Sequence, residues 1–370
     1  MDSLHINCDE DGDVMKRKYY IDNIRWIFIL VLIPFHAAMA WNGWEGNYIW
    51  FEPCKPLSAF VIFVDPPYMA TLFVLAGMSI KFSLKKRSSK QFLMERVHKL
   101  LVPLLVGIAT VVAVMTYYAD RFHNGYRGSF LSHYKVFFTH ISDFTGYDGY
   151  FTPGHLWFML FLFLVSCLVL GVIGLQKRFL PDLSFENCKL IGLILLGAVP
   201  EIFAPVLDFG GKSIGRSFAL VLIGYYIFSE ETVIHRIEKY AGIFLGITAV
   251  SSSCLVILFV FLENQTSVWN TIFCDISQWF GILGVIGFAG KHMNWNNKVT
   301  QYLSKNSFRI YIVHFMWIVI SQYYLSQVVS EIYLLYALSV ISALLLTLFT
   351  VEVIGWIERM IKGRIKKDRK

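Results

Sequence analysis

Two ionisable residues, Arg25 and His36, lie within one apolar stretch near the N-terminus, RWIFILVLIPFHAAMAW. They are eleven residues apart, and at 100° per residue this spacing places both side chains on one face of a helix, about 16 Å apart along its axis. A charged group at the middle of a bilayer costs about 2.5 to 3.5 kcal/mol on insertion scales, so each residue needs a partner or a function. Because imidazole transfers protons near neutral pH, His36 is a candidate general base.

Two further residues of the same segment, Asp22 and Pro34, bear on whether Arg25 and His36 are functional or structural. Asp22 lies one turn before Arg25 on nearly the same stripe and is a natural counter-ion for it. The alternative for the three side chains is structural: Arg25 at the headgroup level paired with Asp22, and His36 hydrogen-bonded inside a helical bundle. Pro34 removes its own N–H and clashes with the carbonyl of Leu30, which predicts a kink just below His36.

A second cationic group, in ERVHKLLVP, combines Arg96 and Lys99 at i and i+3. Cations where a helix enters the membrane are suited to holding a phosphate-bearing ligand. Positive-inside topology and attraction to anionic membrane lipids explain the same residues equally well.

Two later segments add polar side chains to apolar helices. GHLWFMLFLF places His155 beside Trp157, and KNSFRIYIVHF places Tyr311 and His314 three residues apart. With His36, the two further histidines could line a route through the protein, with His314 nearer the cytoplasm and His155 nearer the outside. Each of them alone is also compatible with a hydrogen-bonded core histidine.

The composition indicates that these segments lie in a membrane. Of 370 residues, 56% are hydrophobic and 16% charged, with a mean hydropathy of +0.55. Soluble domains carry roughly a quarter charged residues. The net charge of +7 is therefore assigned to membrane topology and not to nucleic-acid binding. The six cysteines lie far apart, with neither C-x-x-C nor zinc-ligand spacing, so neither a metal site nor a disulfide framework is indicated.

Apolar stretches predict an all-α, polytopic membrane protein, because crossing the hydrocarbon core takes about 20 residues. The short stretch LSAFVIFVD (57–65) is expected to be an interfacial or re-entrant piece that ends at Pro66-Pro67. Ten spans are expected, at 22–41, 67–84, 98–118, 155–175, 189–207, 213–229, 241–261, 270–290, 306–326 and 332–356.

The distribution of Lys and Arg predicts the orientation, because cytoplasmic loops carry an excess of them. With the N-terminus inside, the cytoplasmic segments hold 26 of these residues and the outer segments hold 6. Both termini are therefore expected in the cytoplasm: a tail at 1–19, one membrane domain at 20–356 and a basic tail at 357–370. The longest outer connection, 119–154, is rich in Tyr, His, Gly and Asp, which suits a polar ligand and also an ordinary solvated loop.

Several of these segments together resemble the acyltransferase-3 family of integral-membrane acyltransferases. YYIDNIRWIFILVLIPFHAAMAW is similar to the family's first span, with Arg, ten residues and His. YMATLFVLAGMSIKFSLKKR resembles the second span, with Ala76 where a Ser is usual, and ERVHKLLVP resembles the Arg-x-x-Arg start of the third, with Lys99 replacing the second Arg. HLWFMLFLF and NSFRIYIVHF resemble later family segments. YYIDN-x-RW with HLWF is closest to the branch that includes glucan-modifying succinyltransferases, the glucans biosynthesis protein C type.

The resemblance implies acyl transfer from cytoplasmic acetyl-CoA or succinyl-CoA to a hydroxyl of a carbohydrate or another polyhydroxyl acceptor, in the cell membrane and without a metal. It assigns His36 to catalysis, as general base on the acceptor hydroxyl or as a transient acyl carrier. We also expect Asp22 in catalysis, and His155 and Trp157 in substrate binding. Residues expected near the acyl-CoA are Arg25, Arg96, Lys99, Tyr311 and His314. The sequence leaves a homodimer open.

Two other classes of function fit the same residues. In a proton-coupled transporter or flippase the histidines would form a proton relay and Pro34 a hinge. A non-catalytic lipid-binding partner would leave the spacing of Arg25 and His36 without a purpose.

Overall fold

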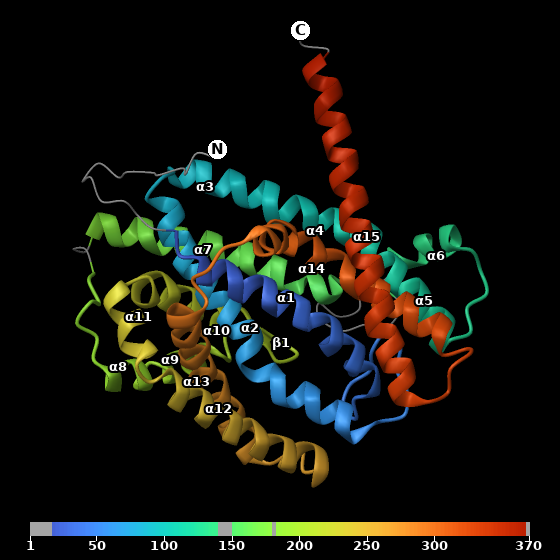
Figure 1. Cartoon of the computed structure of the whole chain (residues 1–370), viewed down its shortest axis with the longest axis horizontal. Helices are drawn as coiled ribbons and strands as arrows, with labels where there is room; N and C mark the ends of the chain where they lie inside the picture. The colour runs from blue at the N-terminus through green and yellow to red at the C-terminus, as the bar shows by residue number, and fades with distance from the viewer. Residues whose placement is uncertain (1–16, 140–149, 180–182, 368–370) are drawn as a thin grey trace.

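The computed structural model describes residues 17–139, 150–179 and 183–367, and within them it confirms an all-α protein (Figure 1). One short antiparallel hairpin interrupts the helices, formed by β1 (Asp208–Phe209) and β2 (Lys212–Ser213). The expected N-terminal tail lies almost entirely outside the described residues. The expected C-terminal tail is helical as far as Lys367, as the continuation of α15 (Ile332–Lys367).

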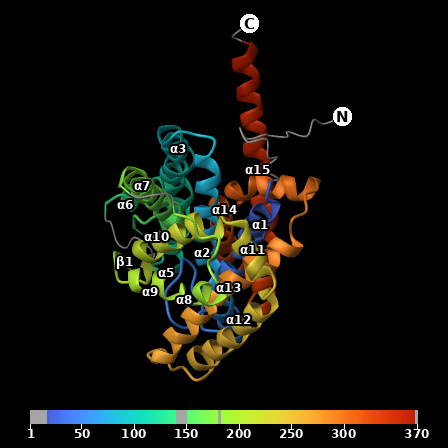
Figure 2. The ribbon, with the colours of Figure 1, turned by 90° about the vertical axis from the view of Figure 1, so that its left-hand side faces the viewer.

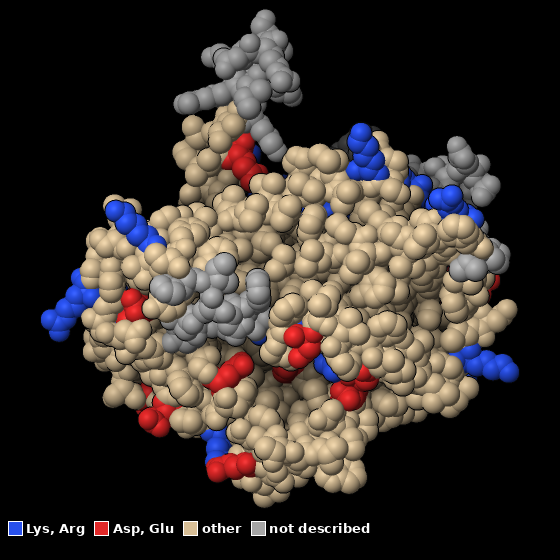
Figure 3. All heavy atoms as spheres, turned by 180° about the vertical axis from the view of Figure 1, so that it is seen from behind, with Lys and Arg blue, Asp and Glu red and all other residues tan. Residues whose placement is uncertain are grey.

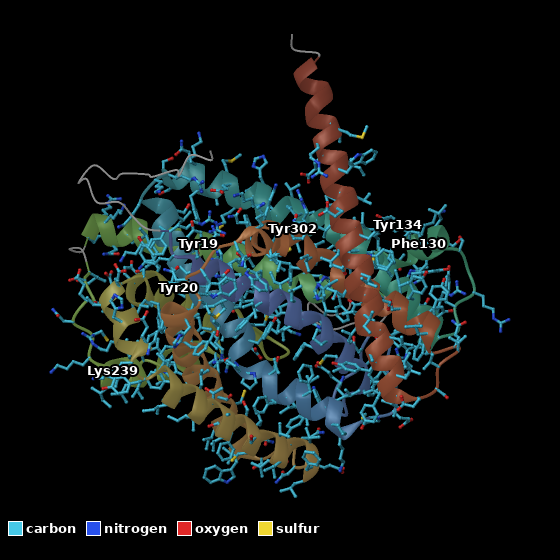
Figure 4. All side chains as sticks on the ribbon, viewed as in Figure 1. Tyr19, Tyr20, Phe130, Tyr134, Lys239 and Tyr302 are labelled. Carbon is cyan, nitrogen blue, oxygen red and sulfur yellow. The ribbon has the colours of Figure 1, made fainter. Side chains whose placement is uncertain are left out.

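The first half of the chain contains four long helical segments. They are α1 (Tyr19–Ala38); α2 (Lys55–Leu84); the continuous run of α3 (Ser89–Arg96), α4 (Val102–Gly107) and α5 (Ala113–His123), joined by π-helical turns; and α7 (Trp157–Phe179). The shorter α6 (Phe130–Phe137) packs beside α5 at one edge of the molecule, where Figure 4 labels Phe130 and Tyr134.

The second half begins with short helices and ends with long ones. The short ones are α8 (Leu190–Leu195), α9 (Ala198–Phe203), α10 (Ile214–Ile223) and α11 (Glu231–Glu238). The long ones that precede α15 are α12 (Ala241–Val256), α13 (Val268–His292) and α14 (Lys298–Leu325).

The expectation of ten spans is met only in part. The described residues contain 7 helices long and apolar enough to cross a membrane, or 8 if Ile214–Phe228 and Glu231–Glu238, bent by 96°, are counted as one span. The chain is thus a multi-pass membrane protein. The expected fifth span corresponds to the shorter apolar segment Leu190–Phe203. The expected ninth span, α14, is long but too polar to be counted, because it places Asn306, His314 and Gln322 in the interior.

The expectation of a separate piece at LSAFVIFVD was wrong. α2 runs from Lys55 to Leu84 and contains both Pro66 and Pro67. Prolines are tolerated inside membrane helices where neighbouring helices support the backbone, and α2 packs against α1, α10, α12 and α13. The two prolines lack the N–H groups that would bond the carbonyls of Ile62 and Phe63.

The ends of the helices separate into two sides. The start of α1, the end of α2 and the end of α15 lie toward the upper side in Figure 1, and the start of α2 and the connection between α12 and α13 lie toward the lower side. Figure 2 shows the same separation, with α15 extending well beyond the other helices. Which side faces the cytoplasm stays a prediction from the charge distribution.

Candidate active site

A cavity of about 230 Å³ lies where α1, α2, α7 and α14 meet. His36, His155, Trp157 and Tyr311, four residues singled out in the sequence, line it. The loops at 44–48 and 154–155 and the β hairpin also contribute to the wall. These are connections that the charge distribution places on the outer side. Figure 3 shows the molecule hollowed on one face, with several acidic side chains around the hollow.

The three membrane histidines form one cluster and are not spread across the membrane. The ring centroid of His314 lies 5.4 Å from that of His36 and 5.4 Å from that of His155. His36 is half-buried and His155 is buried, and both reach the cavity. His314 is fully buried and does not line it. The sequence predicted that His314 lies nearer the cytoplasm and His155 nearer the outside. In the structure the rings of these two histidines instead lie side by side.

Backbone contacts fix His155 against α14. His155 Nε2 lies 3.0 Å from the carbonyl oxygen of Ile312, and the hydroxyl of Tyr311 donates to the carbonyl oxygen of His155. The preceding Gly154 has φ +52°, a conformation that favours glycine, and a Cβ there would meet the hydroxyl of Tyr48. The sharp turn at Gly154 therefore brings His155 and the start of α7 to the cavity.

The cavity also contains polar residues that sequence reasoning missed. Asp65 of α2, Glu45 and Lys212 all line it, together with Trp44 and Tyr68. Lys212 acts electrostatically on both His36 and Asp65, and its Nζ lies 5.7 Å from the ring centroid of Trp157. One signal was present in the sequence: Asp65 is an acidic residue that ends an apolar run, LSAFVIFVD. Nothing in the spacing of Lys212 or Glu45 connects them to His36.

Arg25 lies about three turns and Asp22 about four turns from His36 along α1, and neither lines the cavity. Arg25 donates to the carbonyl oxygen of Leu75 at 3.1 Å and to the hydroxyl of Ser79, and lies 3.5 Å from Asp22. Asp22 is held more closely by Arg17, at 2.8 Å. The catalytic role expected for Asp22 stays a prediction, and its contacts are those of a counter-ion.

Arg96 and Lys99 have separate partners. Arg96 stacks on Phe92 with its guanidinium carbon 4.6 Å from the ring centroid, and it is close enough to Arg25 for their like charges to repel. Lys99 is largely exposed and pairs with Glu95 at 2.5 Å. Two arginines that approach each other with few acidic partners are suited to an anion. Of the expected cationic residues, Arg96 is within electrostatic reach of Arg25, while Lys99 turns to the surface.

The arrangement separates two chemical environments. A half-buried imidazole faces a cavity with aromatic, carboxylate and amide side chains, a setting suited to removing a proton from a bound hydroxyl. The guanidinium group of Arg25, at the far end of the same helix, and that of Arg96 at the end of α3 are suited to a phosphate or another anion. Among the described residues, no cluster of His, Cys, Asp and Glu is arranged to hold a metal ion.

Comparison with known proteins decides the family. The acyltransferase-3 family model, described as an acyltransferase domain, matches residues 18–352. The chain belongs to the acyltransferase-3 family. Within this family it is similar to glucans biosynthesis protein C of Escherichia coli O157:H7, with 22% identity over 332 residues, 81% of each chain. Glucans biosynthesis protein C of Escherichia coli O81 is 22% identical over 331 residues, again 81% of each chain. No solved structure matches.

Membership of the acyltransferase-3 family makes the chain a membrane acyltransferase. The resemblance seen in the first span, in HLWF and in the late histidine segment is thereby confirmed at the level of the family.

Proposed function

We propose that this protein is an O-acyltransferase of the cell membrane that moves an acetyl or succinyl group from cytoplasmic acyl-CoA to a hydroxyl of a glycan or another polyhydroxyl acceptor. The observation that carries the proposal is the placement of His36 on the wall of a cavity while Arg25 lies three turns away on the same helix. Family membership supports acyl transfer, and the names of the relatives suggest a glucan.

Arg25 and Arg96 are the proposed anchor for the phosphates of the acyl donor. Arg25 is held by α2 through Leu75 and Ser79, so its guanidinium is positioned before any ligand binds. Guanidinium groups bind phosphate in two-pronged geometry, which a lysine cannot reproduce. The flexible pantetheine arm of CoA would then carry the thioester along α1 toward His36.

The cavity is the proposed acceptor site. Trp44, Trp157 and Tyr68 offer flat apolar faces for the faces of sugar rings, while Asp65 and Asn47 can hydrogen-bond hydroxyl groups. This mixture of aromatic and hydrogen-bonding groups suits a polyhydroxyl compound better than a fatty or a strongly ionic acceptor.

His36 is the proposed general base. Its unprotonated ring nitrogen takes the proton from the acceptor hydroxyl as the oxygen attacks the thioester carbonyl. Collapse of the tetrahedral intermediate breaks the carbon–sulfur bond, and the departing CoA thiolate takes the proton back from His36. Holding both substrates beside one imidazole supplies much of the rate enhancement through proximity.

The test uses the purified full chain with radiolabelled acetyl-CoA or succinyl-CoA and candidate glycans. We expect label in the glycan with the wild type, its loss with His36→Ala, and weaker acyl-CoA binding with Arg25→Ala. His98→Ala is the matched control, because His98 is an exposed histidine outside the cavity. A wild type that neither binds acyl-CoA nor labels any acceptor would overturn the proposal. Full transfer by His36→Ala would overturn the role of His36 alone.

A further inference from the structure

His314 is the buried neighbour of His36 on the side away from the cavity. Their ring centroids are 5.4 Å apart, and only His36 lines the cavity. His36 is also stacked on Phe315, with centroids 4.2 Å apart and ring planes at 12°. Since Phe315 fixes the plane of the imidazole, the remaining variable is which of its two nitrogens carries the proton.

The protonation of His314 follows from its contacts. His314 Nδ1 lies 2.7 Å from the carbonyl oxygen of Tyr311 and 3.2 Å from that of Ile310. A carbonyl oxygen only accepts hydrogen bonds, so Nδ1 must carry the proton. In the neutral ring Nε2 is then an acceptor, and this buried atom has no hydrogen-bond partner among the described residues.

The same argument applies to His155. Its Nε2 donates to the carbonyl of Ile312 at 3.0 Å, so Nδ1 is an acceptor, and it too is buried without a partner among the described residues. Two acceptors cannot satisfy each other. An unmade hydrogen bond at a buried polar atom costs about 1–3 kcal/mol, so a donor is needed within the cluster. The ring of His36 is a source of such a donor: it lies 5.4 Å from the ring of His314, centroid to centroid, and carries one N–H when neutral.

We propose that His314 is a positioning residue: its Nε2 accepts the N–H of His36 and thereby holds the lone pair of His36 toward the cavity and the acceptor hydroxyl. This inference rests on the proposed function for its catalytic consequence, but not for the hydrogen bond itself. A partner on the far nitrogen of a catalytic histidine selects its tautomer, as a carboxylate does in hydrolase triads. Here the partner is a neutral imidazole, whose own proton is fixed by the backbone of α14.

The first measurement is on the wild-type full chain labelled with ¹⁵N-histidine in lipid nanodiscs. Nuclear magnetic resonance separates protonated from unprotonated ring nitrogens and detects coupling across a nitrogen–nitrogen hydrogen bond. We expect His36 in a single tautomer coupled to His314 Nε2. Absence of that coupling, or a mixture of His36 tautomers, would overturn the proposal without bearing on acyl transfer.

The second measurement uses two variants. His314→Phe keeps an aromatic ring and removes the acceptor, whereas His314→Gln keeps an acceptor oxygen. We expect His314→Phe to mix the tautomers of His36 and lower kcat by about 10- to 100-fold with KM for acyl-CoA unchanged, as for other residues that orient a functional histidine. His314→Gln should recover part of kcat. Unchanged kcat in His314→Phe contradicts the positioning role, whereas a wild type without transferase activity contradicts only the proposed function.

Discussion

Arg25 of α1 and Ser79 of α2 are joined by a hydrogen bond on the half of α1 that lies away from the cavity. The same guanidinium donates to the carbonyl of Leu75, so one side chain fastens two membrane helices. Its position is thus set by the fold, and Asp22 compensates only part of its charge, at 3.5 Å. A fixed cation whose counter-ion is shared with Arg17 can take an additional anion.

We expect Arg25→Lys to bind acyl-CoA about tenfold more weakly while kcat changes little. Lysine keeps the charge but has one compact ammonium, which cannot bond Leu75, Ser79 and a phosphate in the geometry of a guanidinium. Tenfold corresponds to about 1.4 kcal/mol of binding free energy. Isothermal titration with acetyl-CoA and steady-state kinetics would measure the two quantities.

The control for Arg25 is Ser79→Ala, which removes the hydroxyl that Arg25 contacts and leaves the cation in place. We expect its acyl-CoA affinity to fall less than that of Arg25→Lys, because the guanidinium stays in place and keeps its hydrogen bond to the carbonyl oxygen of Leu75. Equal affinities of Arg25→Lys and the wild type would show that the site does not depend on the guanidinium.

The close approach of α2 and α10 yields a stability prediction. A Cβ added to Gly77 would overlap the carbonyl oxygen of Val221, and one added to Gly224 would overlap that of Val74. Backbone atoms cannot move aside as side chains do, so Gly77→Ala must separate the two helices. We expect a loss of about 1–3 kcal/mol in the free energy of unfolding, measured by titration with denaturing detergent.

Gly171→Ala in α7 is the matched control, because nothing lies within 4 Å of its added Cβ. Alanine is the better helix former, so we expect this variant to be as stable as the wild type or slightly more stable. Equal effects of the two substitutions would mean that the helix contact at Gly77 does not limit stability.

Much of the fold could be predicted from the sequence, because long apolar runs identify membrane helices directly. The errors came where hydropathy and structure diverge. Pro66-Pro67 looked like a boundary, yet the packing of four helices against α2 carries that helix through both prolines. α14 is polar because it faces the interior, so apolarity alone does not mark it as a span.

The candidate site was predictable only in part. Helical spacing identified Arg25 and His36, and polar residues in apolar segments pointed to His155, Tyr311 and His314. The contacts among them depend on how α1, α7 and α14 pack, which no local pattern encodes. Lys212 comes from a hairpin about 175 residues after His36, and only tertiary structure brings it to the same cavity.

His133 of α6 gives a prediction on pH and stability. It is fully buried, its Nε2 lies 3.4 Å from Asp120, and burial lowers its pKa although Asp120 opposes the shift. The folded protein thus binds fewer protons at this site than the unfolded chain, and stability rises with pH. The contribution is complete above the usual histidine pKa of about 6.5 and is lost as the pH falls through the lowered value.

The midpoint of thermal unfolding should therefore fall between pH 7.5 and about pH 5 more steeply in the wild type than in His133→Gln, which cannot take up a proton there. The comparison needs only purified protein in detergent and no substrate. Parallel pH profiles of the two proteins would mean that His133 is no longer shielded from solvent in the folded state.

Asp65 carries the last prediction, which separates the acceptor site from the donor site. Asp65→Asn keeps the size of the side chain and removes its charge and its ability to accept two hydrogen bonds through carboxylate oxygens. Hydrogen bonds to charged groups contribute about 1.5–3 kcal/mol, so we expect kcat/KM for the glycan acceptor to fall about 10- to 100-fold. Acyl-CoA affinity should not change, because Arg25 and Arg96 lie outside the cavity.

Asp275→Asn is the control, since this carboxyl group of α13 does not line the cavity. If Asp65→Asn weakened acyl-CoA binding and left the acceptor parameters intact, the acyl group would have to enter the cavity from the side of α2, and Asp65 would belong to the donor path.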